Sequence, residues 1–225
     1  MFRAFSLGVA LVALSACAQD PFAERLEHPR MNARGWIAIA ELGVEQIDPA
    51  ERALMTTYAE TSDRELVKSC TGARSATWVR AEAIAPSDDA LAELAGADGL
   101  VTRHRVSVEA CGATRLHALY LAPREGRIVT GTPGGSIASL GLQREVLRIM
   151  APQAAGIISS SFEEGECDAM AYAPWVLDTA LVYPPEDGAW REIWTVGACG
   201  QTREVEVSFE ETEDGATFRA PIFLD

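Results

Sequence analysis

The chain has 225 residues, a hydrophobic fraction of 48% and a formal net charge of −14, so it can build one large core or two modest ones. Its excess of carboxylates excludes a nucleic-acid-binding surface, which needs clustered arginine and lysine, and we expect no nucleic acid among its partners. The same charge disfavours docking of the folded body onto anionic lipid.

Residues 1–16 have the pattern of a signal peptide. Arg3 gives a short positive start, and the apolar run over residues 4–14 is too short to span a bilayer, which takes about 20 residues. The run ends in Leu14-Ser15-Ala16-Cys17, which resembles the lipobox of bacterial lipoproteins. The resemblance implies cleavage before Cys17, attachment of lipid to that residue, and a place in the cell envelope held by a membrane anchor.

The residues around and after Cys17 indicate the target membrane, an alternative cleavage site and a tether. Ala18 rather than aspartate follows the cysteine, and by resemblance to enterobacterial sorting this favours the periplasmic side of the outer membrane over the inner membrane. The alternative is ordinary cleavage after Ala16-Cys17-Ala18, which also satisfies the small-residue rule at such sites. Residues 17–35 lack apolar periodicity, so we expect them to form a tether to the first folded module.

The rest of the chain repeats itself. Val101–Pro133 aligns without a gap on Ala189–Pro221, 88 positions later, with nine identical pairs of thirty-three where about two are expected by chance. In both copies a tryptophan follows a cysteine by eight residues, namely Cys70 and Trp78, then Cys167 and Trp175. We therefore predict two tandem α+β modules, residues 36–133 and residues 134–225, with an insertion at 85–99 and a turn or short linker at 131–135.

The first module begins with a predicted helix. Asp48-Pro49 supplies an N-cap and a proline at the first helical position, and Leu54 and Tyr58 fall along the apolar face. A strand follows, and then a hairpin whose apolar alternation pairs Val108 with Leu119.

The second module is predicted to have the same order of elements. Its helix begins near Ser139 and ends at Pro152, because proline breaks the backbone hydrogen-bond ladder. Its hairpin pairs Ala198 with Val205 and leaves a four-residue loop over residues 200–203. Each module is therefore expected to be a helix packed on a small antiparallel sheet of three or four strands.

The cysteine count supports this division. Besides Cys17 the chain has four cysteines, which allow three pairings, and the duplication selects Cys70–Cys111 and Cys167–Cys199, one disulfide in each module. The alternative is a four-cysteine zinc site, but it lacks a C-x2-C knuckle and export favours oxidation. We therefore expect no metal and no cofactor.

The histidines do not form an obvious catalytic set. His28 lies in the tether, and the predicted hairpin register keeps His104 apart from His117, so both are expected at the surface or at the edge of a core. The only lysine, Lys68, has no Ser-x-x-Lys arrangement around it, and the glycine-rich segment at 131–136 lacks the lysine of a phosphate-binding loop.

Carboxylates and tryptophans are the remaining candidates for catalytic or ligand-binding residues. Two clusters of carboxylates are expected to lie in solvated loops. If such carboxylates were paired in a cleft, they could hydrolyse a glycan or hold a cation. The clusters are Glu163, Glu164, Glu166 and Asp168, and Glu210, Glu211, Glu213 and Asp214. The tryptophans are expected in the cores, and Trp190 is the best candidate for a ligand-facing aromatic.

Together these patterns favour a cell-envelope lipoprotein that acts as a non-enzymatic interaction or structural module, with an envelope protein as its partner. The alternatives are a carboxylate-dependent envelope hydrolase that acts on cell-wall glycan, and a module that binds a small ligand or sugar in the groove between the two copies. No catalytic residue is assigned from the sequence.

Overall fold

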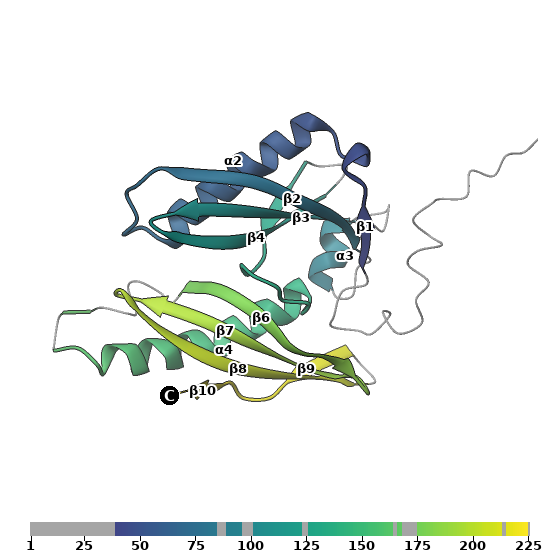
Figure 1. The fold of residues 1–225 in the computed structure, drawn as a ribbon. Coiled ribbons are helices and arrows are strands. Elements are labelled where there is room, and N and C mark those ends of the chain that lie inside the picture. The colour runs from purple at the N-terminus through teal and green to yellow at the C-terminus, as the bar shows by residue number, and fades with distance from the viewer. Residues whose placement is uncertain are drawn as a thin grey trace, which may run out of the picture.

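The computed structural model describes residues 39–84, 89–95, 101–122, 126–163, 166–167, 175–212 and 215–224. The predicted signal peptide, Cys17 and the tether lie outside these residues. The described chain has an α+β architecture with two antiparallel sheets, which form an upper and a lower half in Figure 1. No helix among the described residues is long and apolar enough to cross a membrane.

The first half has a five-stranded sheet in the order β1-β2-β3-β4-β5. Its elements are β1 (Ile39–Leu42), the short 3₁₀ helix η1 (Val44–Gln46), α2 (Pro49–Leu66), β2 (Arg74–Ile84), α3 (Asp89–Ala95), β3 (Val101–Ala110), β4 (Ala113–Leu121) and β5 (Ile128–Thr130). The helix α3 falls inside the predicted insertion, and its Leu94 and Ala95 are buried against the sheet.

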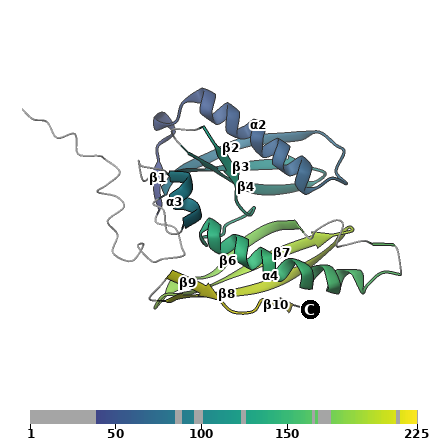
Figure 2. The same cartoon turned by 180° about the vertical axis from the view of Figure 1, so that it is seen from behind.

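The second half has the strand order β10-β8-β7-β6, with β9 paired to β8. Its elements are α4 (Leu140–Ser159), β6 (Trp175–Glu186), β7 (Ala189–Ala198), β8 (Gln201–Thr212), β9 (Gly215–Phe218) and β10 (Ile222–Leu224). Figure 2 shows α2 and α4 in front of their own sheets, so the two helices cover the same side of the molecule.

Helix α2 starts where the sequence predicts, but it buries a different face. The side chain of Asp48 caps it by accepting a hydrogen bond from the amide of Ala50, and Pro49 occupies the first turn. The buried residues are Met55, Ala59 and Asp63, whereas Leu54 and Tyr58 are exposed. The predicted face was wrong because an aspartate lies in the buried stripe and breaks its apolar pattern.

Helix α4 continues past Pro152 to Ser159, so the predicted end was also wrong. Proline removes one backbone donor, but the following turns are held by packing. Ala155 and Ile158 are buried in a cluster with Ala198 of β7. Burial of these side chains therefore compensates for the missing hydrogen bond.

Both hairpins turn more tightly than the sequence pattern predicts. Cys111 and Cys199 have φ of 49° and 51°, and each is followed by a glycine with positive φ, as in two-residue type I′ turns. Val108 consequently pairs with Arg115, and Ala198 with Gln201, so both predicted registers were wrong by four residues. A shift of four keeps every side chain on the predicted face of its sheet.

Each half contains one disulfide, with the pairing that the sequence predicts. Cys70 is bonded to Cys111, and Cys167 to Cys199. In each case a hairpin tip is joined to the segment that follows the helix of that half. The tip cysteine occupies the left-handed conformation that non-glycine residues rarely adopt, and the covalent bond holds it there.

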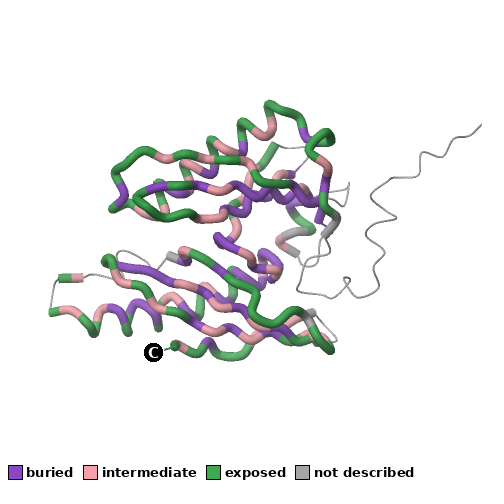
Figure 3. Tube along the Cα trace, viewed as in Figure 1, coloured by how far each residue is buried: buried purple, intermediate pink, exposed green. Residues whose placement is uncertain are grey.

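The connection between the halves is buried rather than a solvated linker. Thr132, Pro133 and Gly134 are buried, and Figure 3 shows this segment in the colour of buried residues between the two sheets. The amide of Gly134 donates to the carbonyl of Leu116 in the first half, and that of Gly135 to the carbonyl of Thr179 in the second. The connection is thus bonded to both sheets.

Candidate functional site

A groove with a volume of about 620 Å³ lies between the two helices and has a mostly apolar surface. Helix α2 forms one wall with Tyr58 and Leu66, and helix α4 forms the other with Leu147 and Ala151. The buried connection at residues 130–133 and His117 of β4 also line it. A concave apolar space of this size is typical of small-ligand sites.

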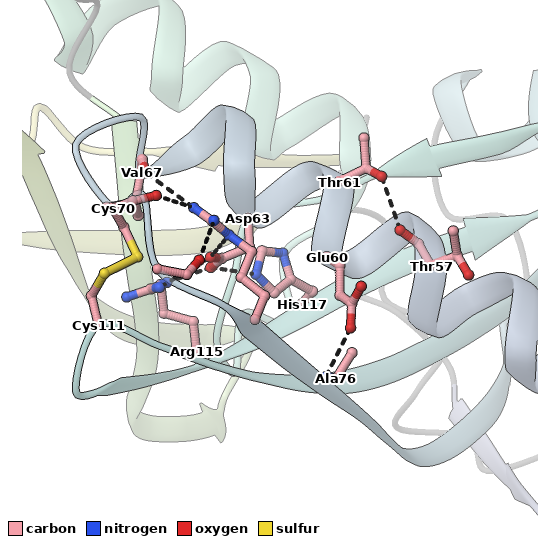
Figure 4. Close-up of polar contacts among 12 residues, drawn as sticks. Thr57, Glu60, Thr61, Asp63, Val67, Cys70, Ala76, Cys111, Arg115 and His117 are labelled. Carbon is pink, nitrogen blue, oxygen red and sulfur yellow. Dashed lines mark hydrogen bonds and ion pairs between the residues drawn. A yellow bond between two sulfur atoms is a disulfide. The ribbon is translucent and has the colours of Figure 1, made fainter.

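Asp63 lies beside this groove at the centre of a polar cluster (Figure 4). Its carboxylate is fully buried and accepts hydrogen bonds from Arg74 Nε at 2.9 Å, Arg115 Nη2 at 3.1 Å and His117 Nε2 at 3.2 Å. Burial acts to raise the pKa of Asp63, but its hydrogen bonds and the charge of Arg115 lower the pKa below its usual value. The carboxylate is therefore an anion at neutral pH.

The secondary structure explains why these residues meet. Met55, Ala59 and Asp63 recur every four residues, so Asp63 continues the buried face of α2 onto the sheet. Arg115 and His117 are two residues apart on β4 and point to the same face. Arg74, at the start of β2, also donates to the carbonyls of Val67 and Cys70, which closes the end of the helix near the disulfide.

His117 is the member of the cluster that reaches the groove. Only 1% of its side chain is exposed, and burial lowers its pKa despite the neighbouring Asp63. The ring is therefore neutral at pH 7, and because Asp63 is an anion the proton is on Nε2. Its Nδ1 is buried and has no hydrogen-bond partner among the described residues. His117 therefore lines the groove as a neutral ring whose Nδ1 is enclosed by protein atoms.

The rim of the groove carries charge and hydroxyl groups. Glu65 on α2 and Arg144 on α4 are exposed, and neither forms an ion pair with another described residue. The hydroxyls of Ser62 and Thr130 lie 3.5 Å apart. Polar groups at the rim and apolar groups along the walls are the distribution expected for a site that binds an amphipathic molecule.

His104 lies on β3, on the same face of the sheet as His117, but it has different neighbours. It lies 2.9 Å from Glu51 through Nε2, and its Nδ1 accepts a hydrogen bond from the indole of Trp78. Burial lowers its pKa to about 4. His104 and His117 are both fully buried, so the expectation of surface or edge positions was wrong. Both imidazoles lie on the face of the sheet that carries Val106 and Leu119, and α2 covers this face.

A buried ionic cluster on the opposite face of the first sheet was missed by the sequence analysis. Glu82 accepts a hydrogen bond from Arg103 at 2.6 Å, and Arg105 lies 3.7 Å from the same oxygen. Arg103 and Arg105 also donate to the carbonyl of Ser136 in the connection. Arginine at alternate positions along β3 is the pattern of a solvated face, so no signal in the sequence indicated that these side chains are buried.

The second half contains a buried carboxylate at Glu192, which lies 88 residues after His104, at the spacing of the predicted duplication. Its carboxylate is fully buried and accepts hydrogen bonds from the indoles of Trp190 and Trp194 and from the amides of Ile137 and Ala138. Trp190, the predicted ligand-facing aromatic, is 1% exposed, stacks on Phe209 in the core and lines a second hollow over this sheet.

The acidic clusters are only partly described. Glu163 and Glu166 are exposed, and Glu210 lies 3.5 Å from Arg219 at the surface. Glu164, Asp168, Glu213 and Asp214 lie outside the described residues or have no described side chain. Within the described part of the chain, no group of three or more histidine, cysteine, aspartate or glutamate residues is placed to hold a metal ion.

Comparison of the chain with known proteins identifies no relative. No protein-family model matches the chain, and neither does any curated protein or solved structure.

Proposed function

We propose that this chain is an exported, lipid-anchored binding protein of the bacterial cell envelope, and that the groove between its halves takes a small apolar ligand. The observation that carries the proposal is the 620 Å³ groove with mostly apolar walls between α2 and α4. Small-molecule sites are usually preformed, apolar and between structural units, and this groove has all three properties.

Export is supported by the covalent chemistry of the chain. Disulfides persist in oxidising compartments such as the periplasm, and both halves contain one. The lipobox resemblance at residues 14–17 would then place lipid on Cys17 and leave the four other cysteines fully paired. Replacement C17S is expected to release the protein from the membrane fraction, and a variant that stays with membranes contradicts the anchor.

We also propose that the halves are tandem copies of one unit. Support comes from the shared order of a capped helix followed by a strand and a hairpin, with a cysteine at each hairpin tip. In this interpretation the groove is the space between the two copied helices. The ligand therefore contacts both copies, and neither copy offers the site alone.

The small number of carboxylates near the groove favours a binding function over glycan hydrolysis. A glycosidase needs two carboxyl groups with separate acid and base or nucleophile roles. Among the described residues that line the groove, Glu65 is the one carboxylate, and the neighbouring Asp63 is occupied by two arginines and a histidine.

The proposal is tested with Nile red, an uncharged apolar fluorophore. The native protein is expected to bind one molecule saturably with increased emission. A151W places a large side chain in the groove and is expected to abolish this binding. I149W, on the exposed face of the same helix, is the matched control and should bind normally. Equal binding by both variants would show that the fluorophore sits elsewhere, against the proposal.

Protein binding at the outer face of the second sheet is a second candidate function. Tyr183 and Ile222 are 52% and 58% exposed, which is unusual for large apolar side chains, and both line a second hollow of about 600 Å³. I222K is expected to weaken recovery of an envelope partner from solubilised membranes without weakening Nile red binding. Unchanged recovery with I222K excludes this face as the partner surface.

A further inference from the structure

We infer that the ligand of the groove is an anionic amphiphile, with a carboxylate head group that pairs with Arg144 and an apolar chain that lies along the walls. The inference rests on the proposed function, since it names the chemical class of the ligand for the same groove. It distinguishes that ligand from uncharged apolar molecules and from amphiphiles with a cationic head group.

Arg144 is a cation without a counter-ion in a chain that has carboxylates in excess. The chain has 33 aspartate and glutamate residues against 19 lysine and arginine residues, so its cations are expected to find partners. Arg144 lines the groove from α4 and is exposed, yet it forms no ion pair with another described residue. Arg148, one turn later on α4, is also exposed and also lacks a described ion-pair partner. Like charges four residues apart destabilise a helix, so an anion bound beside Arg144 would offset this repulsion.

The directions of the two helices place Arg144 toward one end of the groove. Figure 1 and Figure 2 both show α2 and α4 running in the same direction. The residues that line the groove begin with Tyr58 on α2 and Leu140 on α4, and they end with Leu66 and Ala151. Arg144 therefore belongs to the end where both helices enter the groove, about 10 Å along the helix from Ala151.

The other polar groups along the groove are compatible with an anion at this end. Tyr58 is 43% exposed, and its hydroxyl forms no hydrogen bond with another described residue, so it can donate one. A carboxylate only accepts hydrogen bonds, and it fits the planar guanidinium of arginine with two parallel bonds. Glu65 lines the groove toward the other end, about 10 Å along α2 from Tyr58. Distance and solvent therefore weaken the repulsion between Glu65 and a head group at Arg144.

The walls of the groove suit the chain of the amphiphile. Leu66, Leu140 and Leu147 contribute apolar side chains, and the volume of about 620 Å³ lies within the range of small-ligand sites. Because Arg144 is exposed at the rim, the charged head group would stay in contact with water while the chain lies between the helices. This arrangement avoids the free-energy cost of burying a charge.

The test compares decanoate, 1-decanol and decyltrimethylammonium as competitors of Nile red at neutral pH, because the three share a decyl chain and differ in head-group charge. In R144Q the affinity for decanoate is expected to fall about three- to fivefold, the upper part of the range for an exposed ion pair, while the affinity for decanol stays the same. The fall should become smaller at high salt, which screens exposed charges. R144K keeps the charge and should bind decanoate nearly as tightly as the native protein. R64Q removes an exposed arginine of α2 that does not line the groove, and this matched control should bind all three competitors normally.

The possible results separate the head group from the groove. Equal affinities of the native protein and R144Q for decanoate, with Nile red still displaced, overturn the inference about the head group and leave the apolar groove standing. Tighter binding of decyltrimethylammonium than of decanoate, lost in E65Q, would assign a cationic head group to Glu65 and overturn the inference as well. Failure of Nile red and all three competitors to bind the native protein overturns the proposed function, and this inference with it.

Discussion

Acidification is expected to destabilise the fold through His104 in a predictable pH range. The imidazole is fully buried between Glu51 and Trp78, and its Nδ1 accepts a hydrogen bond from the indole. Protonation at Nδ1 would place two N–H donors against each other, in addition to burying a charge. The folded state therefore resists the proton, with a pKa of about 4 against 6.5 for the free side chain.

The magnitude follows from this difference. Between pH 6.5 and pH 4 the unfolded chain binds a proton at His104 that the folded chain does not, so the free energy of unfolding falls as the pH falls. At about 1.4 kcal/mol per pKa unit, the loss from this one residue reaches about 3 kcal/mol near pH 4. That is a large share of the 5–15 kcal/mol that is typical of a domain. Burial raises the pKa of Glu51, so the folded chain binds a proton there at a higher pH than the unfolded chain does, which opposes the effect of His104.

The assay is urea denaturation from pH 7 to pH 4, followed by tryptophan fluorescence. H104N is the comparison, because the asparagine oxygen can still accept from Trp78 and the side chain does not titrate. The buried Asp63 titrates in both proteins, so the difference between the two pH profiles reports on His104 together with its contact to Glu51. The native protein should lose about 3 kcal/mol more than H104N. Parallel profiles would show that His104 is protonated as easily in the fold as in the unfolded chain, which refutes this account.

Three further predictions concern stability. D63N leaves two buried arginines without their anion and should cost about 3–5 kcal/mol in urea denaturation, whereas a loss below about 1 kcal/mol would contradict the central place of this carboxylate. G134A should destabilise by more than about 2 kcal/mol, because φ is 93° and the new Cβ would lie 2.2 Å from the amide nitrogen of Thr179. The control G156A, in an open part of α4, should stabilise by about 0.5–1 kcal/mol, and equal effects of the two alanines would be inconsistent with the buried connection. Reduction of the disulfides, which close separations of 41 and 32 residues, should lower the urea midpoint by an amount equivalent to about 4 kcal/mol for each bond, and an unchanged midpoint would contradict it.

The sequence was most informative where a local signal has one structural meaning. The caps at Asp48 and Ser139 mark the starts of α2 and α4, because their side chains satisfy free backbone amides in the first turn. The cysteine pairing followed from internal comparison of the two halves. Alternating apolar residues also assigned the correct faces to both hairpins, because the register shift of four is a multiple of the strand period of two.

The sequence was least informative where tertiary contacts decide the local structure. The turns at Cys111 and Cys199 place a cysteine at positive φ, which local preference disfavours and the disulfide maintains. Pro152 would end an isolated helix, yet burial of later side chains extends α4. The cluster around Asp63 combines residues from three elements, and no local pattern links a helix aspartate to a histidine 54 residues later. The groove depends on how the halves meet, which periodicity does not encode.

The buried connection also determines how the molecule can move. Residues 134–138 are bonded on one side to Arg103 and Arg105 of the first sheet, and on the other side to Thr179 and Glu192 of the second. Hinge bending usually occurs at connections with few contacts on either side, and this one lacks that freedom. The two helices therefore keep a fixed spacing, so entry of a ligand relies on rotation of side chains at the rim and not on opening and closing of the halves. Association is then expected to be fast and to leave the backbone of both halves unchanged.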